Sequence, residues 1–329
     1  MIDDSREIRK KEYEEFCKSN YVQIYSKPWW MDVICGEDNW DVWLYKSGNV
    51  VQAAMPYYIE KRGKYIYITK AIFTQTNGII FADEKSNKEA AIAKKQDRII
   101  KEACEFIKNM NVDVYEQQYP YSFVNWQPFY WQRYTNFLRY TYVIENTWDS
   151  ECWMGNMTPQ MRNHIKKGCN SLSCDENITV EQFYNEHVKI FEKQGKNNPF
   201  SFEFWKKFYF ECKKQECCKM MCARDNAGNI AAIIFLVWDE QSVYQLLGGY
   251  MPEYSSLQGF PYLIYQGIIF AGEMKLKYDF EGSMVPQLAR SYREYGGTAK
   301  PYFRIRKVFN PEIIMAEAEE SVKQIEEVL

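Results

Sequence analysis

The sequence lacks the residues from which many enzymes build their sites. Its 329 residues include only two histidines, His164 and His187, which removes most ways of forming a histidine-rich metal centre. No Gly-x-Ser-x-Gly elbow is present to support a serine hydrolase. The four cysteines between residues 212 and 222 lack the Cys-x2-Cys pairs of a structural zinc site. We therefore expect no metal.

Long apolar runs are also absent. The longest, Ile230–Trp238, is far shorter than the ~20 residues that span a bilayer, and the first ten residues are polar, without the apolar run of a secretory signal. Ten cysteines are too few for a disulfide scaffold, so we expect reduced thiols. The expectation is a cytoplasmic protein without a transmembrane segment, either free or at the periphery of the membrane's inner face.

An excess of one charge sign is missing too, since 41 Lys and Arg stand against 44 Asp and Glu, for a net charge of −3. Non-specific binding of duplex nucleic acid needs a broad basic face, so we expect no such partner. Aromatic residues, in contrast, make up 17% of the chain, with 10 Trp, 26 Tyr and 20 Phe. This is more than two cores need, and it indicates grooves that hold a flat or extended ligand.

The same order of elements is predicted twice along the chain. In each half, two strands joined by a glycine-containing turn precede a third strand, an amphipathic helix and a last strand. Three antiparallel strands, a crossover helix and a returning strand make a mixed α/β unit of the α+β kind. The predicted ranges are 41–45, 50–59, 64–69, 86–109 and 112–116 in the first half, and 219–223, 230–238, 241–247, 256–271 and 276–280 in the second.

Helices precede the strands in both halves, and a ring-rich connection joins the halves. Residues 117–145 are dense in aromatics, which predicts an ordered connection or a short hairpin. Residues 311–329 predict an acidic amphipathic helix that begins at a proline. Helical spacing predicts the remaining helices over 8–19, 29–35, 179–194 and 202–214.

Four passages of the second half occur in the order seen in one known family. They are TPQMRNHIKK at 158–167, the stretch 179–226 that ends with Ala-Arg-Asp-Asn, YDFEGS at 278–283, and the stretch from Tyr295-Gly296 to Lys307. Together they resemble the FemABX-like branch of the GNAT acyltransferase superfamily. In the first half, Ser26–Trp30 and Thr74–Gly78 fit the same family.

The resemblance implies two tandem GNAT-like domains, with the acceptor side at 1–147, including the connection 117–145, and the donor side at 148–329, including the C-terminal helix. It also implies transfer of an acyl or aminoacyl group to an amine. Known family members use aminoacyl-tRNA to extend a peptidoglycan precursor, and ordinary GNAT relatives use acyl-CoA. We expect no tightly bound cofactor and leave the donor undecided between acyl-CoA and aminoacyl-tRNA, in which case a tRNA acceptor end is a partner.

Amide formation needs aligned reactants, donors for the developing oxyanion, and a group that takes a proton from nitrogen. Main-chain amides exposed between two parted strands could donate hydrogen bonds to the oxyanion. For the proton, strand alternation puts Asp279 and Glu281 on one face and Phe280 on the other. Gly282 and Ser283 follow, and a glycine there permits close approach to a ligand. Solvated or salt-bridged carboxylates beside a simple turn are the alternative.

A basic segment extends from Arg290 to Lys307, with a net charge of +5 and interleaved tyrosines. Cations among rings suit a phosphate-bearing ligand that can stack, such as a nucleotide or a tRNA end. A solvated basic strand neutralised by the acidic C-terminal helix is the alternative. The candidate donor-binding residues are Gln258, Gly259, Ser283, Arg290, Arg304 and Arg306.

Two departures from the family pattern concern the donor. CoA-using relatives hold pyrophosphate on the amides of a glycine-rich loop, whereas residues 258–261 here read Gln-Gly-Phe-Pro, and proline has no amide hydrogen. Tyr292 aligns with a functional lysine of the Fem peptidyltransferases, and Arg293 lies beside it in the sequence. The candidate catalytic residues are Glu281, Asp279, Arg293 and Tyr292.

The candidate acceptor-binding residues combine amides and hydroxyls, which can bind sugar hydroxyls or a peptide, with tryptophans, which can stack on a sugar ring. A polar turn beside core tryptophans is the alternative. The candidates are Trp29, Trp30, Thr74, Gln75, Thr76, Asn77, Gln117 and Gln118.

These patterns favour an acyltransferase or aminoacyltransferase acting on an amine of a cell-envelope glycan or peptidoglycan precursor. A second hypothesis has acyl-CoA as donor and a nucleotide-linked amino sugar as acceptor. A third is a catalytically degenerate copy that binds glycans or scaffolds partners, which the tyrosine at position 292 favours.

Overall fold

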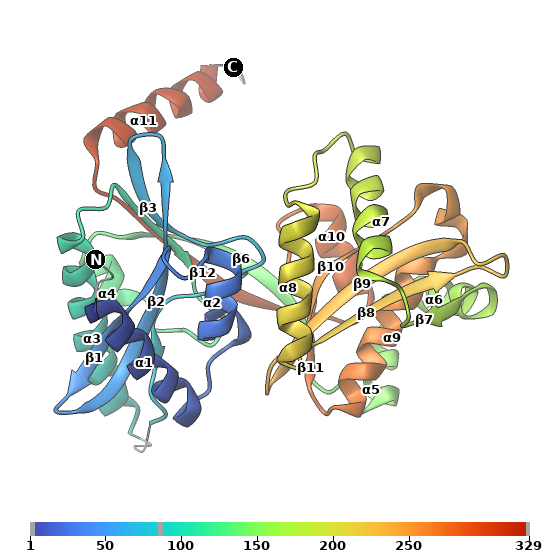
Figure 1. Ribbon diagram of the computed structural model, residues 1–329, viewed down its shortest axis with the longest axis horizontal. Helices are drawn as coiled ribbons and strands as arrows, with labels where there is room; N and C mark the ends of the chain where they lie inside the picture. Colours follow the sequence, from blue (N-terminus) through green and yellow to red (C-terminus); the bar gives the residue numbers. More distant parts are fainter. Residues whose placement is uncertain (1–3, 85–87, 327–329) are drawn as a thin grey trace. The chain divides into compact units, whose positions relative to one another are not determined.

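The computed structural model describes residues 4–84 and 88–326 of the chain (Figure 1). Contacts divide the chain into two compact units. Unit 1 comprises residues 1–139 and 302–329, and unit 2 comprises residues 140–301. The sequence predicted a single division between residues 147 and 148, whereas the contacts group the last 28 residues, 302–329, with the first unit.

Unit 1 is a mixed α/β layer structure. Its strands follow the order β1 (Trp40–Ser47), β2 (Val50–Arg62), β3 (Tyr65–Thr69), β5 (Val114–Gln118) and β12 (Thr298–Val308), and β4 (Ile80–Phe81) pairs with β2. The first three are antiparallel, β5 is parallel to β3, and β12 is antiparallel to β5. Its helices are α1 (Asp4–Ser19), η1 (Ile24–Ser26), α2 (Pro28–Cys35), α3 (Glu89–Asn109), α4 (Gln127–Trp131) and α11 (Pro311–Glu326).

Unit 2 repeats this plan. Its strands follow the order β6 (Thr135–Ile144), β11 (Lys277–Asp279), β10 (Ser242–Tyr250), β9 (Ile230–Trp238), β8 (Cys218–Arg224) and β7 (Ser173–Asp175). β8, β9 and β10 are antiparallel, and β11 is parallel to β10. Its helices are α5 (Ser150–Asn156), α6 (Pro159–Ser171), α7 (Val180–Lys193), α8 (Phe202–Lys214), η2 (Pro252–Leu257), α9 (Gly259–Glu273) and α10 (Pro286–Glu294).

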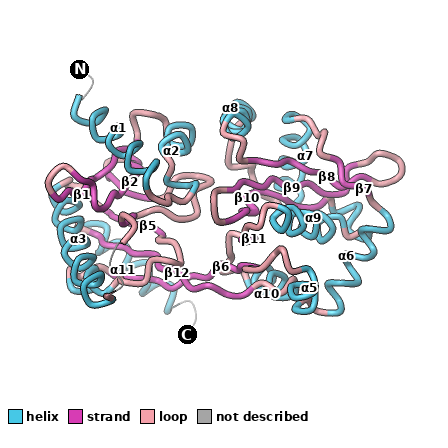
Figure 2. Tube along the Cα trace, turned by 90° about the horizontal axis from the view of Figure 1, so that it is seen from below, coloured by secondary structure: helices cyan, strands magenta, loops and turns pink. Residues whose placement is uncertain are grey.

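Helices cover both faces of the strands in each unit, which confirms the predicted α/β class. In unit 2, α7 and α8 pack on one face and α9 on the other; in unit 1, α1 and α2 lie on the face opposite α3 (Figure 2). The strand Ile230–Trp238 is buried over seven consecutive residues because it lies in the middle of the layers. The hydrophobic core of unit 2 lies between α9 and these strands.

The main differences from the predicted elements lie in the second half of the chain. One alternative treated residues 290–307 as a solvated basic strand, but the segment divides into the end of helix α10, a glycine turn and strand β12. β12 begins in unit 2 and then pairs with β5, at Arg304 with Gln118 and at Val308 with Val114. This return of the chain explains why residues 302–329 belong to unit 1, and a linear reading of the sequence cannot detect it.

The connection 117–145 is also more regular than predicted, because it contains the short helix α4 and the strand β6. β6 starts in unit 1 and ends in unit 2. Within the described residues, no helix has both the length and the apolar character needed to cross a membrane.

Candidate active site

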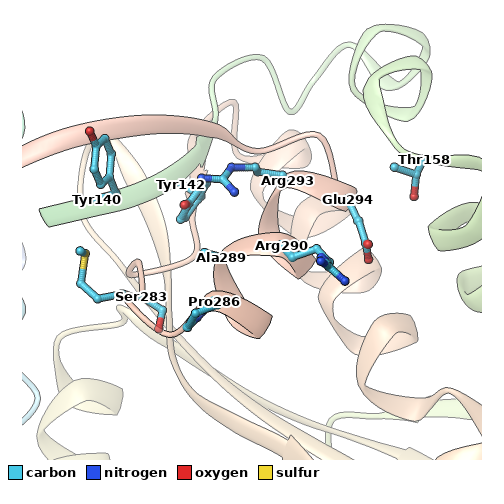
Figure 3. A pocket seen from close by; sticks show the side chains of 10 residues that line it. Tyr140, Tyr142, Thr158, Ser283, Pro286, Ala289, Arg290, Arg293 and Glu294 are labelled. Atoms are coloured by element: carbon cyan, nitrogen blue, oxygen red, sulfur yellow. The ribbon is translucent and has the colours of Figure 1, made fainter. Parts of the chain in front are cut away.

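A pocket of about 530 Å³ opens in unit 2 beside helix α10 (Figure 3). Its walls come from β6, from the turn that follows β11, from α10, and from the N-cap of α6. The Thr158 amide of that N-cap donates to the Glu294 carbonyl at 3.0 Å, which ties α6 to the end of α10. The lining residues are Tyr140, Tyr142, Thr158, Ser283, Met284, Pro286, Ala289, Arg290, Arg293 and Glu294.

The turn after β11 places Ser283 in the pocket wall. Glu281 and Gly282 both have left-handed backbones, with φ of 59° and 68°. A Cβ on Gly282 would lie 2.3 Å from the Tyr140 carbonyl oxygen, so only glycine lets the turn pack this closely on β6. The prediction that Glu281 follows strand alternation was wrong in its premise, because β11 ends at Asp279 and the chain then turns.

Asp279 is buried at the base of this turn. Its Oδ1 accepts hydrogen bonds from the Thr141 hydroxyl and from the Glu281 amide, the latter at 2.8 Å. Burial raises the pKa of Asp279 to about 6, because the ionised carboxylate loses its water and the two hydrogen bonds offset only part of that loss. A carboxyl that titrates near neutrality is suited to proton transfer, but this one is only 3% exposed.

Tyr292 of α10 is packed in the core beside the two carboxylates. Its ring stacks on Phe280 at 4.8 Å between centroids and lies 5.7 Å from the Tyr142 ring. Burial raises the pKa of Tyr292 to about 12, and the negative charges of Glu281 and Asp279 add to the rise. The phenol therefore keeps its hydrogen at neutral pH and can act as a hydrogen-bond donor.

Arg290 and Arg293 bring positive charge to the pocket. The Arg293 guanidinium lies over the Tyr142 ring, 5.3 Å from its centroid, and Figure 3 shows the two side chains side by side. Both arginines are exposed, and neither forms an ion pair with any residue that the structure describes. Two such cations in one concave site favour an anionic ligand.

Arg304 and Arg306, which were predicted to bind the donor, lie in unit 1 and do not line this pocket. Arg304 pairs with Glu116 of β5 at 2.5 Å. Arg306 pairs with Glu116 at 3.1 Å and with Glu317 of the C-terminal helix at 2.5 Å. These contacts match the alternative of a basic strand neutralised by that helix, and donor binding by these two residues stays a prediction.

Gln258 and Gly259 lie at the start of α9, also outside the pocket. A Cβ on Gly259 would lie 3.0 Å from that of Ala232, so the helix start packs directly on β9. The Phe260 ring covers Gly248 of β10, where an added Cβ would lie 2.7 Å from it. This helix start is therefore occupied by the protein's own side chains, and Pro261 removes one amide from it.

The prediction that two parted strands expose main-chain amides to the oxyanion concerns β10 and β11, and it stays a prediction. They pair only from Ser242 to Tyr244, and β10 then continues to Tyr250 paired with β9 but not with β11. Just beyond the last pair, the register of β10 against β9 shifts between Gln245 and Leu247. The shift interrupts the regular ladder and turns main-chain groups away from pairing.

The predicted acceptor-binding residues do lie together in unit 1, but most bind one another. The Trp30 Nε1 donates to Thr74 Oγ1 at 3.1 Å, and the Gln118 side chain donates to the Gln75 carbonyl at 2.7 Å. Asn77 accepts from Ser26 at 3.1 Å. The residues at 74–77 and 117–118 are all buried.

This network matches the alternative of a polar turn beside core tryptophans, since groups already bonded internally are not open to a sugar hydroxyl. Two features of the set are not part of this network. The Trp29 ring is only half-buried. The Gln117 Nε2 is buried without a hydrogen-bond partner among the described residues. The acceptor role of the set stays a prediction.

Several pocket residues were missed from the sequence. Tyr140, Tyr142 and Thr158 come from segments more than 120 residues before α10, so no local pattern connects them with it. Met284, Pro286 and Ala289 were detectable from the sequence. Pro286 suits the first position of a helix, which would have predicted the start of α10 and placed its neighbours Met284 and Ala289 beside it. No group of three or more His, Cys, Asp or Glu side chains suited to a metal occurs within 4–84 and 88–326.

The comparisons with known proteins agree with this architecture. Residues 160–284 match the family model described as an acetyltransferase (GNAT) domain. A crystal structure of FemX has a TM-score of 0.68 and 11% sequence identity, and covers 93% of this chain and 98% of that chain. No curated protein matches the chain by sequence.

Two further structures are similar over nearly the whole length. A tandem GNAT protein from the clavulanic acid biosynthesis pathway has a TM-score of 0.53 and 9% identity, covering 94% of this chain and 97% of that one. L-PGS from Bacillus licheniformis has a TM-score of 0.54 and 10% identity, covering 93% and 94%. The resemblance is thereby confirmed: the chain has the fold of FemX and of a tandem GNAT protein, and its residues 160–284 match the GNAT domain.

Proposed function

We propose that this protein is an N-acyltransferase that moves an acyl or aminoacyl group onto an amine of a cell-envelope glycan or peptidoglycan precursor. The observation that carries the proposal is the pocket beside α10. Its two arginines have no carboxylate partner among the described residues, and Ser283, from the turn that follows β11, forms part of its wall. The acceptor class comes from the resemblance to the FemABX-like branch.

The pocket suits the phosphate-bearing end of an activated donor. A guanidinium presents a planar set of N–H donors that matches phosphate oxygens, and Arg290 and Arg293 lie one turn apart on the same helix. Tyr140 offers a half-buried ring for a base to stack on. Both aminoacyl-tRNA and acyl-CoA carry such phosphates, but the occupied start of α9 favours aminoacyl-tRNA.

In the proposed step the acceptor nitrogen attacks the acyl carbonyl carbon. A C–N bond forms, the ester or thioester bond of the donor breaks, and the electron pair leaves with the donor oxygen or sulfur. Glu281 takes the proton from nitrogen, while Asp279 positions it through the hydrogen bond to its amide. Arg293 replaces the lysine of the Fem peptidyltransferases in stabilising negative charge, since Tyr292 carries none.

One observation favours the hypothesis of a degenerate homologue. Tyr292, at the position of the family's lysine, is buried in a stack with Phe280 and is not a pocket-lining residue. If Arg293 does not replace the lysine, the pocket binds an anion without catalysing transfer.

The decisive experiment offers the purified protein each donor with each acceptor class. Charged tRNA and acyl-CoA are combined separately with amino-sugar nucleotides and with a muramyl-peptide precursor, and mass spectrometry follows the acceptor. A mass increase that Arg293→Ala and Glu281→Gln abolish, and that the control Phe210→Ser on the exposed side of α8 keeps, supports the proposal. Ligand binding without a mass increase in any combination favours the degenerate homologue.

A further inference from the structure

Unit 1 exposes a group of large apolar side chains on the segment that connects the two halves of the sequence. Val124, Tyr130, Trp131 and Leu138 are 76%, 60%, 57% and 44% exposed. Single exposed apolar residues are ordinary on a protein surface, but with Phe137, which is 53% exposed, five within fifteen residues form a concentration that water does not favour.

These side chains continue outward from the core of unit 1. The Trp126 ring packs on Phe303 of β12 and on Tyr130 of α4, each at 5.8 Å between centroids. Trp126 and Phe303 also pack against the hydrophobic core cluster of this unit. Tyr130 therefore lies at the outer edge of a continuous apolar path that starts in the core.

Leu138 joins the same path through the pairing of β6 with β12. The Thr135 hydroxyl donates to the Arg306 carbonyl at 3.1 Å, and the Arg139 Nε donates to the Tyr302 hydroxyl at 3.4 Å. These two contacts bring residues 135–139 of β6 beside residues 302–306 of β12, and the exposed Leu138 belongs to this stretch. We call Val124, Trp126, Tyr130, Trp131, Leu138 and Phe303 the aromatic surface.

The charges of the segment are one-sided. Residues 117–139 contain Arg133 and Arg139 but no Asp or Glu, in a chain whose acids outnumber its Lys and Arg. The exposed Arg133 forms no ion pair with a described residue. Asp97, which lies close by on α3, accepts a hydrogen bond from Asn125 at 2.9 Å.

We propose that the aromatic surface binds the interface of an anionic lipid bilayer. Tyrosine and tryptophan prefer the boundary between headgroups and acyl chains, because their rings are apolar and their polar atoms stay hydrated. The two arginines meet negative headgroups there, and no carboxylate on the segment repels them. The chain rests on the membrane through this surface and does not span it.

The location fits the proposed acceptor class without depending on it. Envelope precursors are assembled at the membrane, so a membrane-bound transferase meets them at high local concentration. The membrane test needs neither donor nor acceptor, so its failure leaves the transferase proposal standing, and failure of the transfer assay leaves this one standing.

The test is cosedimentation of the full chain with vesicles of phosphatidylcholine, alone or with phosphatidylglycerol. We expect the parent chain to bind the anionic vesicles. The variant with Tyr130→Ser and Trp131→Ser should bind at least about tenfold more weakly, because it can no longer bury these two rings in the bilayer interface. Arg133→Gln weakens binding at low salt. Phe210→Ser, which removes a ring 54% exposed on α8 of unit 2, is the matched control and binds like the parent.

The proposal is overturned if the parent chain stays in the supernatant with anionic vesicles at low salt. It is also overturned if the double variant binds as the parent does, or if Phe210→Ser loses as much. A third outcome would show that a second copy of the chain covers the surface instead. In that case the parent chain does not bind vesicles and is a dimer by sedimentation velocity, whereas the double variant is a monomer. Unchanged circular dichroism and melting temperature confirm that each variant is folded.

Discussion

The Thr141 hydroxyl on β6 donates a hydrogen bond to Oδ1 of Asp279 at the end of β11. The same oxygen accepts the amide hydrogen of Glu281, so one atom joins two neighbouring strands and the turn that follows them. The proposed base is therefore held in place by a buried carboxyl that is itself ionisable. A change in the protonation of Asp279 acts on stability and on the turn together.

Replacing Asp279 by Asn gives a pH signature with a defined sign. The folded pKa, about 6, lies above the ordinary 3.8, so the stability that this carboxyl contributes is complete below pH 3.8 and is lost as the pH rises through 6. Asn keeps the accepting Oδ1 and never ionises. We expect the stability of Asp279→Asn relative to the parent to rise between pH 4 and 6, by up to about 3 kcal/mol.

Urea unfolding at four pH values measures this difference. A difference that stays flat or falls between pH 4 and 6 contradicts the assignment of a raised pKa to Asp279.

Replacing His187 should change the stability relative to the parent with the opposite dependence on pH. His187 is 2% exposed among Phe183, Phe191 and Phe200, and burial lowers its pKa from 6.5 to about 4. Its contribution is therefore complete above pH 6.5 and is lost as the pH falls through that window towards 4. Relative to the parent, His187→Phe should gain stability as the pH falls from 6.5 to 4, by up to about 3 kcal/mol.

The double variant with Asp279→Asn provides the internal check. The two sites titrate independently if its pH dependence equals the sum of the two single changes, and a His187→Phe difference independent of pH rules out the lowered pKa.

Gly282→Ala should be strongly destabilising. Alanine would have to adopt a backbone φ of 68°, and its methyl group would lie 2.3 Å from the Tyr140 carbonyl oxygen of β6. The turn must therefore move. We expect a loss of at least about 2 kcal/mol together with a loss of any transferase activity. Gly228→Ala is the control, because its φ is 87° but nothing lies within 4 Å, and it should cost about 1 kcal/mol.

Denaturant titration of both variants makes the comparison. Equal losses for the two glycines would mean that the contact with Tyr140 does not hold the turn.

The pocket arginines should bind anions while the strand arginines should not. We expect Arg290→Ala and Arg293→Ala each to weaken the binding of inorganic pyrophosphate by about tenfold or more, because each removes a charge-assisted hydrogen bond. Arg293→Lys keeps the charge but not the planar fork, so it should restore part of the affinity. Arg306→Ala should leave the affinity unchanged, since its guanidinium is engaged by Glu116 and Glu317.

Calorimetric titration at two salt concentrations measures these affinities. A parent protein that does not bind pyrophosphate, or a loss for Arg306→Ala as large as that for Arg293→Ala, would contradict the assignment of the anion site to α10.

The local sequence pattern was sufficient to predict the elements whose ends are marked by a turn or a helix cap. The strand Ile230–Trp238 and the helix Phe202–Lys214 were predicted with the bounds that β9 and α8 have. The first is an apolar run after a turn, where Asp225 accepts from two main-chain amides and Gly228 has φ of 87°. The second begins at Ser201, whose hydroxyl caps Phe204.

Tertiary pairing was not predictable in the same way. The order of residues 278–293 identified the neighbourhood of the pocket, because a turn and a following helix keep their residues together. Tyr142 and Thr158 reach the same place only through the pairing of β6 with β11 and the hydrogen bond of Thr158 to α10. Thr74 and Asn77 were candidate ligand contacts, yet Trp30 and Ser26 bind them, and a sequence does not show which partner a polar group finds.

The pairing of β12 with β5 has a consequence for biosynthesis. The part of β12 that pairs with β5 follows all of unit 2 in the sequence, so during translation the edge of β5 stays unsatisfied until unit 2 has been synthesised. An open strand edge is the kind of template on which nascent chains associate wrongly. The half of the protein that is made first is thus the half that is completed last.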